Sequence, residues 1–454
     1  MKIKNRFPYI IAMIYFAFIL GMGGVMAQKV WTLEECITYA FENNIQIKQS
    51  RLQTETAEIN LLQSKLDFAP YINGGSNLNY NWGRNIDPVT NIYNNKQTMN
   101  NNYSLNGQID LFNGLSKWST LKKSEVDLKS SLYLSEEIEN SIALNLTGSY
   151  LNILFSHELL LVAEKQLDVT KKQIERTEKL VEAGTLPKGD LLEINAQGAS
   201  EETNLISAEN ALSLAYLDLK QILDLPAETD LNIDRPNIRL AKDLNIIPSE
   251  QVYANAVETM PEIKGSEMDL LSAEHSVKIA KSSLYPRLSL SGGIGTNYND
   301  TQKEDILDPN SPVMAFNDQF RNNRGEYITL SLSVPIFNGY SARSQVNRAK
   351  VQSVNQSFEL QLRKNELRKN IEQKYYDALA AYKTYNASKI SVESLKESFK
   401  YTEEKFNVGM VNSVDYSLAK MKLTQAESDL LRAKYDYIFK TKILDFYMGI
   451  PLTL

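Results

Sequence analysis

The stretch Ile109-Asp110-Leu111-Phe112-Asn113-Gly114 decides the fold, because Val334-Pro335-Ile336-Phe337-Asn338-Gly339 repeats it 337 − 112 = 225 residues later. Before each Phe-Asn-Gly the apolar and polar residues alternate, which is the period of a β-strand. After each glycine the apolar residues recur three or four apart, as they do in a helix. We therefore predict two joints, at Phe112 with Gly114 and at Phe337 with Gly339, where a strand gives way to a long helix. Glycine permits the abrupt change of backbone direction that such a joint needs.

The repetition extends over most of the chain. Ala40-Phe41-Glu42 matches Ala256-Val257-Glu258 at an offset of 256 − 40 = 216, and from Phe112 onward the offset is 225. At that second offset Gly184 matches Gly409, and Asp190 matches Asp415. The second copy is longer by 225 − 216 = 9 residues in one loop. We interpret this pattern as a duplication, with a first structural repeat at 28–226, an irregular connection at 227–248 and a second repeat at 249–454.

Residues 1–27 read as a secretory signal peptide. Lys2, Lys4 and Arg6 precede an apolar core at 9–20, and Val25-Met26-Ala27 is a small-residue cleavage site. A single transmembrane anchor is the alternative, although the apolar run is short for a membrane span. Cys36 is the only cysteine, so no disulfide forms within the chain. We expect Cys36 to be a small buried apolar residue.

Each repeat reads as two helices, a β-hairpin, a very long helix and a returning helix. The first helix should begin with Thr32 as N-cap and Glu35 closing a capping box. The predicted hairpins lie at about 71–111 and 287–335, the long helices at about 115–183 and 340–408, and the returning helices at about 188–224 and 413–448. Gly184 and Gly409 should end the long helices in a left-handed cap. The fold class is therefore mainly α with a small β part.

The strands are amphipathic, and each is long enough for one tilted crossing of a bilayer. Aromatic residues gather near the Asn-rich ends of the hairpins and suggest an interfacial girdle: Tyr80, Trp82, Tyr103 and Tyr298. Aromatic residues are also ordinary strand formers, and alternating strands also occur in the half-buried sheets of soluble proteins. Four strands are too few to close a membrane barrel, so a membrane location requires several chains to share one. Three chains would provide 12 strands above a tube of helices.

Composition and motifs argue against other classes of function. The net charge is −6, with 49 basic and 55 acidic residues, which recommends no nucleic-acid partner. The chain has two histidines and shows no metal-ligand spacing, phosphate loop or nucleophile motif, so we expect no catalysis and no cofactor. An elongated coiled-coil scaffold or adhesin remains the alternative. It would account for the long helices but not for the amphipathic strands.

The signal peptide, the twofold repeat, the Phe-Asn-Gly joints and the glycine turns resemble the TolC family of outer-membrane efflux proteins. The most specific local match is Phe406-Asn407-Val408-Gly409-Met410-Val411-Asn412-Ser413-Val414-Asp415, with a weaker echo at Ala183-Gly184-Thr185-Leu186-Pro187-Lys188-Gly189-Asp190. The resemblance implies a homotrimeric exit duct in the outer membrane of a Gram-negative bacterium, with its helical barrel in the periplasm. A periplasmic adaptor would dock at the turns, through Gly184, Thr185, Val408, Gly409 and Met410, and would connect the duct to an inner-membrane pump.

The resemblance also implies an acidic ring that narrows the periplasmic aperture. Asp415 matches the first ring position and Asp190 is its repeat counterpart, whereas Leu418 stands at the second ring position. Phe406 and Val411 replace the tyrosine and the basic residue of the family's hydrogen-bonded latch, so that latch does not carry over. Both aspartates also suit the N-terminal turn of a helix, where the helix dipole stabilises an acid. The sequence names neither the transported substrate nor the particular adaptor and pump.

Overall fold

The computed structural model describes residues 30–86, 91–95, 97–236, 238, 246–305, 308 and 310–454. The predicted signal peptide at 1–27 lies outside the described residues. The chain divides into two compact units, one made of residues 1–48, 139–256 and 370–454, the other of 49–138 and 257–369. Each unit takes segments from both predicted repeats, because the long helices contribute residues to both units.

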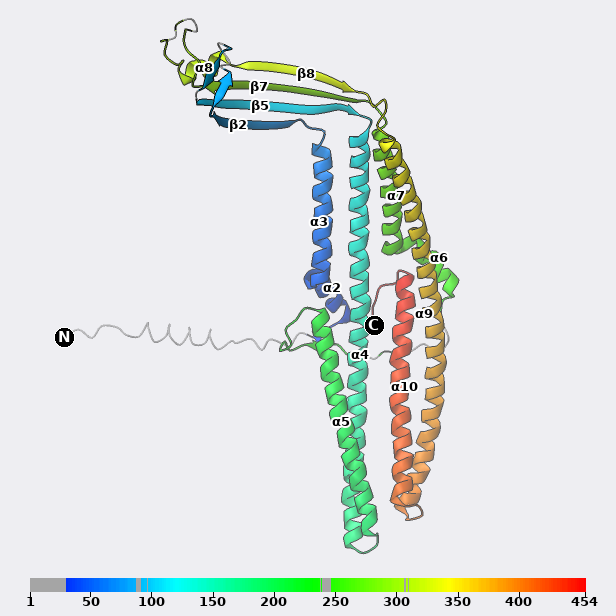
Figure 1. Cartoon of the computed structure of the whole chain (residues 1–454). Helices are drawn as coiled ribbons and strands as arrows, with labels where there is room; N and C mark the ends of the chain where they lie inside the picture. The colour runs from blue at the N-terminus through cyan, green and yellow to red at the C-terminus, as the bar shows by residue number, and fades with distance from the viewer. Residues whose placement is uncertain are drawn as a thin grey trace, which may run out of the picture. The chain divides into compact units, whose positions relative to one another are not determined.

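The helices have the order that the sequence predicts (Figure 1). In the first half they are α2 (Leu33–Asn43), α3 (Ile45–Leu66), α4 (Ser116–Glu182) and α5 (Lys188–Ile222). In the second half they are α6 (Ser249–Thr259), α7 (Pro261–Ser282), α9 (Ser341–Asn407) and α10 (Ser413–Tyr447). The bounds of α6 and α7 are those of α2 and α3 shifted by 249 − 33 = 216. Those of α9 and α10 are those of α4 and α5 shifted by 341 − 116 = 225.

The start of α2 confirms the predicted capping box. The hydroxyl oxygen of Thr32 accepts a hydrogen bond from the backbone N–H of Glu35 at 3.2 Å, and the Glu35 carboxylate accepts one from the N–H of Thr32 at 3.1 Å. Cys36, on the inner face of α2, is fully buried, as expected. It belongs to the core of the first unit, in which the hydroxyl of Tyr150 on α4 donates to the Asp234 carbonyl at 2.7 Å. That contact holds the described part of the predicted connection against α4.

Four strands form one antiparallel sheet in the order β2-β5-β7-β8. They are β2 (Tyr71–Asn81), β5 (Thr98–Asn113), β7 (Arg287–Asn299) and β8 (Gly325–Ser333). The pairs β2–β5 and β7–β8 are the two expected hairpins, and β5–β7 joins them. The second hairpin was expected to continue to about residue 335, but β8 ends at Ser333. A proline at position 335 lacks the N–H that a longer ladder would need.

The two faces of this sheet differ in chemistry, because side chains alternate along each strand. On one face Leu105 lies opposite Ile294, and Leu290 lies opposite Leu330. On the other face Asn102 lies opposite Asn297. The apolar side chains stay largely uncovered within the chain, and Leu330 is 63% exposed. An apolar face of this extent is typical of a surface that contacts another protein or a membrane.

The loops of both hairpins contain secondary structure that the sequence analysis did not predict. The segment between β7 and β8 contains the short helix α8 (Phe316–Asn322). Gln319 of α8 is fully buried, accepts from the Asn299 N–H at 2.8 Å and donates to the Met314 carbonyl at 2.8 Å. The Asn-rich loop of the first hairpin carries the strand pair β3 (Arg84–Ile86) and β4 (Tyr93–Asn95). Hydrogen bonds from the Gln319 side chain to the backbone thus hold α8 in place, and a backbone ladder holds β3 on β4.

Among the residues that the structure describes, one helix, α4, is long and apolar enough by length and composition to cross a membrane. Several of its apolar residues are instead buried in the core of the first unit, among them Leu146, Tyr150 and Ile153.

Candidate functional site

The two glycine turns lie in the first unit, where α4 turns into α5 and α9 turns into α10 (Figure 1). Gly184 and Gly409 have φ values of 72° and 75°, which confirms the predicted left-handed caps. After Gly184, the N–H of Thr185 donates to the Leu180 carbonyl at 2.9 Å. After Gly409, the N–H of Met410 donates to the Lys405 carbonyl at 2.9 Å. Both turns are therefore Schellman motifs, which satisfy the last carbonyls of the long helices.

Two side-chain contacts join the turns to each other. The Ser413 hydroxyl at the start of α10 donates to the Asp190 carboxylate in the first turn of α5, at 2.7 Å. The Arg176 guanidinium of α4 donates to the side chain and the carbonyl of Asn407, the last residue of α9. A cation at a helix C-terminus and an acid at a helix N-terminus both interact favourably with the helix dipoles. Polar side chains thus connect the two turns by hydrogen bonds.

Asp190 and Asp415 differ in environment although both lie in the first turn of a helix. Asp190 is half-buried and is held by Ser413, whereas the Asp415 side chain is exposed. The backbone N–H of Asp415 donates to the side-chain oxygen of Asn412, the N-cap of α10, at 2.8 Å. Both aspartates lie where a helix dipole stabilises a negative charge. Only the Asp415 carboxylate is exposed to solvent.

The remaining tip residues are exposed at the turns. Val408 and Met410 flank Gly409 with 70% and 73% of their surfaces exposed, and Thr185 is exposed beside Gly184. A groove of about 520 Å³ runs between the turns, lined by Arg176, Thr185, Asp190, Gly409, Met410 and Asp415 among others. Exposed apolar side chains around a polar groove are typical of a surface that binds another protein.

Behind the second turn, aromatic rings pack between α9 and α10. The Tyr416 ring stacks on Phe406 at 4.7 Å and contacts Phe399 at 5.4 Å. Burial raises the pKa of Tyr416 to about 12, and the nearby carboxylates of Glu403 and Glu201 add to the rise. The phenol therefore stays neutral, and the rings hold the end of α9 on the start of α10.

A buried ionic cluster ties α10 to α4 and α5. The Lys420 ammonium lies 3.2 Å from the Glu201 carboxylate, with side-chain exposures of 3% and 9%. Lys420 also donates to the Gln166 carbonyl at 3.0 Å and to the Thr170 hydroxyl. The Glu201 carboxylate further accepts from Thr170 at 2.5 Å and from Gln197 at 2.8 Å. Burial lowers the pKa of Lys420, and Glu201 opposes that shift.

The strand-to-helix joints lie in the second unit and share an unusual backbone. Gly114 and Leu115 have φ values of 65° and 66°, and Gly339 and Tyr340 have 62° and 67°. A Cβ on Gly114 would lie 2.5 Å from the Ser282 carbonyl oxygen at the end of α7, whereas one on Gly339 would meet nothing within 4 Å. The first joint therefore needs glycine for space and conformation, and the second for conformation alone.

The two phenylalanines of the joints are not equivalent. Phe112 lies within β5 beside a β-bulge, whereas Phe337 lies beyond the end of β8 and is 87% exposed.

The predicted girdle residues lie toward the loop end of the sheet. Tyr80 stacks on Trp82 with their ring centroids 6.1 Å apart, and both side chains are exposed. Tyr103 and Tyr298 instead contact Phe316 of α8, at 6.2 Å and 5.5 Å. Two of the four aromatics therefore hold α8, and their role at a membrane interface stays a prediction.

The sequence motifs gave no indication of the roles of Arg176, Asn407 and Ser413 at the turns or of the Lys420–Glu201 pair behind them. Arg176, Glu201 and Lys420 stand in no motif. Asn407 and Ser413 lie within the matched stretch at 406–415, but nothing in that stretch names their partners. These partners are distant in sequence, and Glu201 and Lys420 are 219 positions apart. One signal was available. Lys420 and Glu201 are charged residues on helix faces that are otherwise apolar or small, such as Ile194, Gly198 and Leu423.

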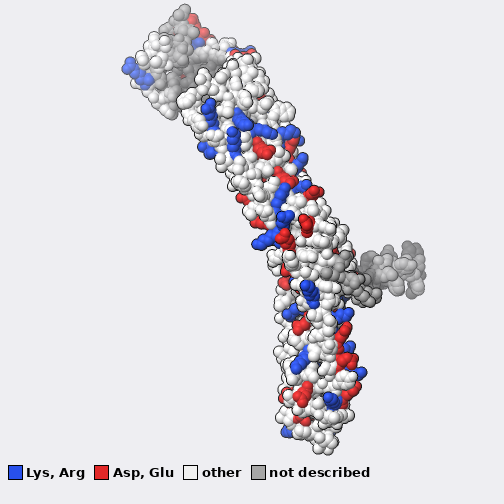
Figure 2. Space-filling model, turned by 90° about the vertical axis from the view of Figure 1, so that its right-hand side faces the viewer, with Lys and Arg blue, Asp and Glu red and all other residues white. Residues whose placement is uncertain are grey.

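Charge on the visible face of the helices is mixed. Figure 2 shows Lys and Arg interspersed with Asp and Glu along this face. Such a surface presents no extended field of one sign to a polyanion.

The chain matches the family model described as outer membrane efflux protein over residues 37–224 and 252–449. It is 23% identical to the outer membrane protein TolC of Vibrio cholerae serotype O1 over 425 residues, which cover 93% of this chain and 92% of that protein. It is 21% identical to the alkaline protease secretion protein AprF of Pseudomonas aeruginosa over 59% of this chain and 53% of that protein.

Solved structures share the fold. The CmeC outer membrane channel of Campylobacter jejuni superposes with a TM-score of 0.74 at 19% identity, over 92% of this chain and 85% of that one. The MtrE outer membrane channel of Neisseria gonorrhoeae, in its open state, gives a TM-score of 0.73 at 16% identity, over 92% and 88%.

Proposed function

The chain belongs to the outer membrane efflux protein family, and from that premise we propose that three copies form one exit duct through the outer membrane. It is an outer-membrane protein whose helical part lies in the periplasm. In our proposal the duct carries substrates from a periplasm-spanning pump complex to the cell exterior. It acts as a conduit and performs no chemistry on what it carries.

The observation that carries this proposal is the sheet of four strands. It exposes an apolar face with residues such as Ile328, Leu330 and Leu332, and its edge strands are β2 and β8. Unpaired strand edges are not tolerated in lipid, and the smallest membrane barrels need about eight strands. Pairing β8 of one copy with β2 of the next removes every edge, and three copies give a barrel of 12 strands. The polar face, with its asparagines and serines, would then line a wet lumen.

The internal repeat supports the same assembly. The equal helix lengths and constant offsets of the two halves are the pattern expected if one structural unit was duplicated. Three such chains would place six similar helix pairs around one axis, which is a helical barrel.

We assign two roles to the two hydrogen-bonded glycine turns. Thr185, Val408 and Met410, presented by the caps at Gly184 and Gly409, form the docking surface for a periplasmic adaptor, through which an inner-membrane pump delivers the substrate. Asp415, exposed at the start of α10, forms the acidic ring of the aperture. Asp190 contributes less to this ring because it is half-buried and held by Ser413.

The mass and conductance of the purified protein test the proposal. In mild detergent the complex should have the mass of three chains, and in a planar bilayer it should open water-filled pores. A monomer that keeps its full strand content, or a complex without conductance, would refute the duct. The second result would leave the scaffold alternative.

A further inference from the structure

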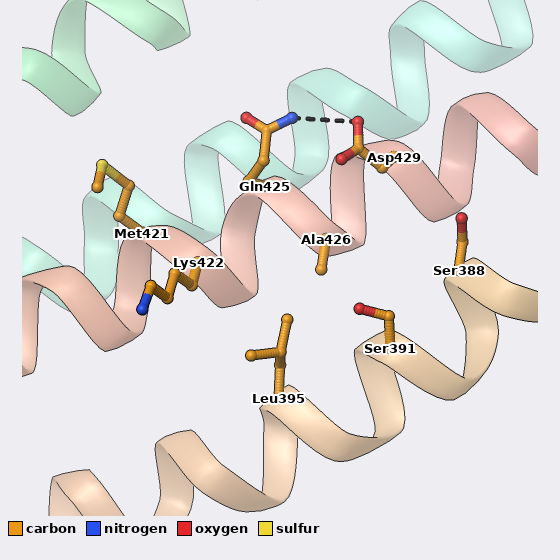
Figure 3. Close-up of a pocket in the computed structure, with 8 residues that line it drawn as sticks. All are labelled: Ser388, Ser391, Leu395, Met421, Lys422, Gln425, Ala426 and Asp429. Carbon is orange, nitrogen blue, oxygen red and sulfur yellow. Dashed lines mark hydrogen bonds between the residues drawn. The ribbon is translucent and has the colours of Figure 1, made fainter.

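A groove between α9 and α10 is open in the single chain. It has a volume of about 510 Å³ and is lined by Ser388, Ser391, Leu395, Met421, Lys422, Gln425, Ala426 and Asp429. Figure 3 shows Leu395 of α9 and Ala426 of α10 pointing into the space between the two helices, whereas Met421, Gln425 and Asp429 extend from the side of α10 away from α9. Small residues such as Ser391 and Ala426 leave this space unfilled. The groove lies entirely within the first unit.

The equivalent groove of the first half is filled. At the offset of 225, Ser391, Leu395 and Ala426 correspond to Gln166, Thr170 and Glu201. Those three residues of α4 and α5 are the partners of Lys420, which inserts between them from α10. The chain therefore contains one complete junction, in which α10 packs onto the α4–α5 pair.

The face of α5 that corresponds to this inserted face of α10 is bare. Ser417 and Lys420 of α10 are buried, and Thr424, Glu427, Leu431 and Lys434 are partly buried. Their counterparts on α5 are all exposed: Leu192, Asn195, Ala199, Glu202, Ile206 and Glu209. One half of the chain thus offers an uncovered helix face, and the other half offers an unfilled groove.

We propose that α5 of a second copy packs into the α9–α10 groove, with Asn195 in the place that Lys420 takes within the chain. This inference rests on the proposed assembly of three copies and specifies which helix faces hold it together. Each copy presents a face at one side and a groove at the other. Such a head-to-tail contact closes into a ring when the rotation between copies allows it.

Charge complementarity supports this occupant. Within the chain, Lys434 of α10 lies 3.1 Å from Glu158 of α4. Their counterparts are Glu209 on α5 and Lys383 on α9, both exposed. Both charges are reversed, so the pair remains attractive in the contact between copies. The change from Lys434 to Glu209 is matched by the change from Glu158 to Lys383. A contact between these positions in two copies requires opposite charges, and the two changes provide them.

The smaller contacts also remain compatible. Gln166, which donates to Glu427 at 3.4 Å, is replaced by Ser391, and Glu427 by Glu202 of the second copy. A serine hydroxyl donates to a carboxylate as an amide does. The Asn195 amide has no charge to neutralise, which suits a groove with Leu395 and Ala426 in place of Thr170 and Glu201. At the same offset of 225, Ser413 and Asp190, which form a hydrogen bond within the chain, correspond to Lys188 and Asp415. In the contact between copies, Lys188 of the second copy would therefore lie near Asp415.

Cysteine cross-linking between differently tagged chains tests the contact. One chain carries Asn195→Cys and the other Ser391→Cys, and the two are co-expressed and treated with a short bis-maleimide. We expect a cross-linked product that contains both tags. The control replaces Asn195→Cys by Glu193→Cys, which lies about 200° around α5 and should give no product. Chains with one cysteine substitution control for Cys36, which is buried.

A charge exchange provides the second readout. Lys383→Glu should lower the yield of the Asn195–Ser391 product several-fold, and adding Glu209→Lys should restore it. The interface would be overturned if the complex has the mass of three chains and the Glu193→Cys variant gives the product while Asn195→Cys does not. That result would leave the proposed duct intact. Failure of the charge exchange to restore the yield would also overturn the interface. A monomeric protein would refute the proposed assembly itself.

Discussion

The buried pair of Lys420 and Glu201 should be strongly coupled, and its removal should loosen the helices behind the turns. The change Glu201→Gln leaves the ammonium of Lys420 buried without a counter-charge, among side chains that are 3% and 9% exposed. Breaking a buried pair by removing one partner costs about 3–5 kcal/mol. The lower figure already corresponds to a more than hundredfold increase in the population of the locally opened state, since about 1.4 kcal/mol is tenfold.

Hydrogen exchange measured by mass spectrometry on α5 and α10 reports this opening directly. Glu201→Gln should accelerate exchange around the cluster by about two orders of magnitude. Lys420→Met should have a smaller effect, because Thr170 and Gln197 still donate to the carboxylate. The double variant should recover most of the loss, since a buried pair replaced as a whole costs little. The control is Lys440→Met on the same helix, whose partner Asp436 is partly exposed.

The pH dependence follows from the sign of the pKa shift. Burial lowers the pKa of Lys420 in the folded protein, so the unfolded chain binds more protons between the lowered value and the ordinary one. Stability therefore rises with pH in that interval, and the penalty of Glu201→Gln should shrink as the pH increases toward the ordinary lysine pKa of about 10.4. The reasoning fails if both single variants behave like Lys440→Met, or if the double variant loses the sum of the two single losses.

Three further changes have defined outcomes. Gly114→Ala should abolish assembled protein in outer-membrane fractions, because its Cβ would meet the carbonyl oxygen at the end of α7 at 2.5 Å, whereas Gly339→Ala should assemble; equal assembly of both would contradict the steric argument. Gly409→Val should strain a residue at φ 75° by roughly 1–2 kcal/mol and reduce transport and adaptor cross-linking, with the mass of the complex unchanged; normal transport would argue against docking at this turn. Asp415→Asn should weaken cation selectivity and block by trivalent cations in single-channel recordings, with Asp190→Asn doing less. Unchanged selectivity in Asp415→Asn would leave helix capping as the role of this residue.

Local sequence pattern was sufficient for the eight long helices and the four strands of the main sheet, but not for α8 or for the pair β3–β4. The change of period after Phe112 and Phe337 located the ends of two strands and the starts of α4 and α9 to within a few residues. The glycines at 184 and 409 marked the caps, because a left-handed residue at a helix end strongly favours glycine. Thr32 and Glu35 marked the start of α2 in the same way. All these signals depend on residues that are close together in the chain.

The tertiary structure alone decided how the elements are joined. Gln319 and the aromatic pair of α8 hold a helix that the polar composition of its loop concealed. Ser413 with Asp190, and Lys420 with Glu201, connect helices whose residues are more than 200 apart in sequence. Periodicity shows which face of a helix is apolar, but it does not identify the polar residue that a distant helix will meet. The packing of the helices decides which charged residues become partners. A lysine and a glutamate tolerate burial only where each compensates the charge of the other.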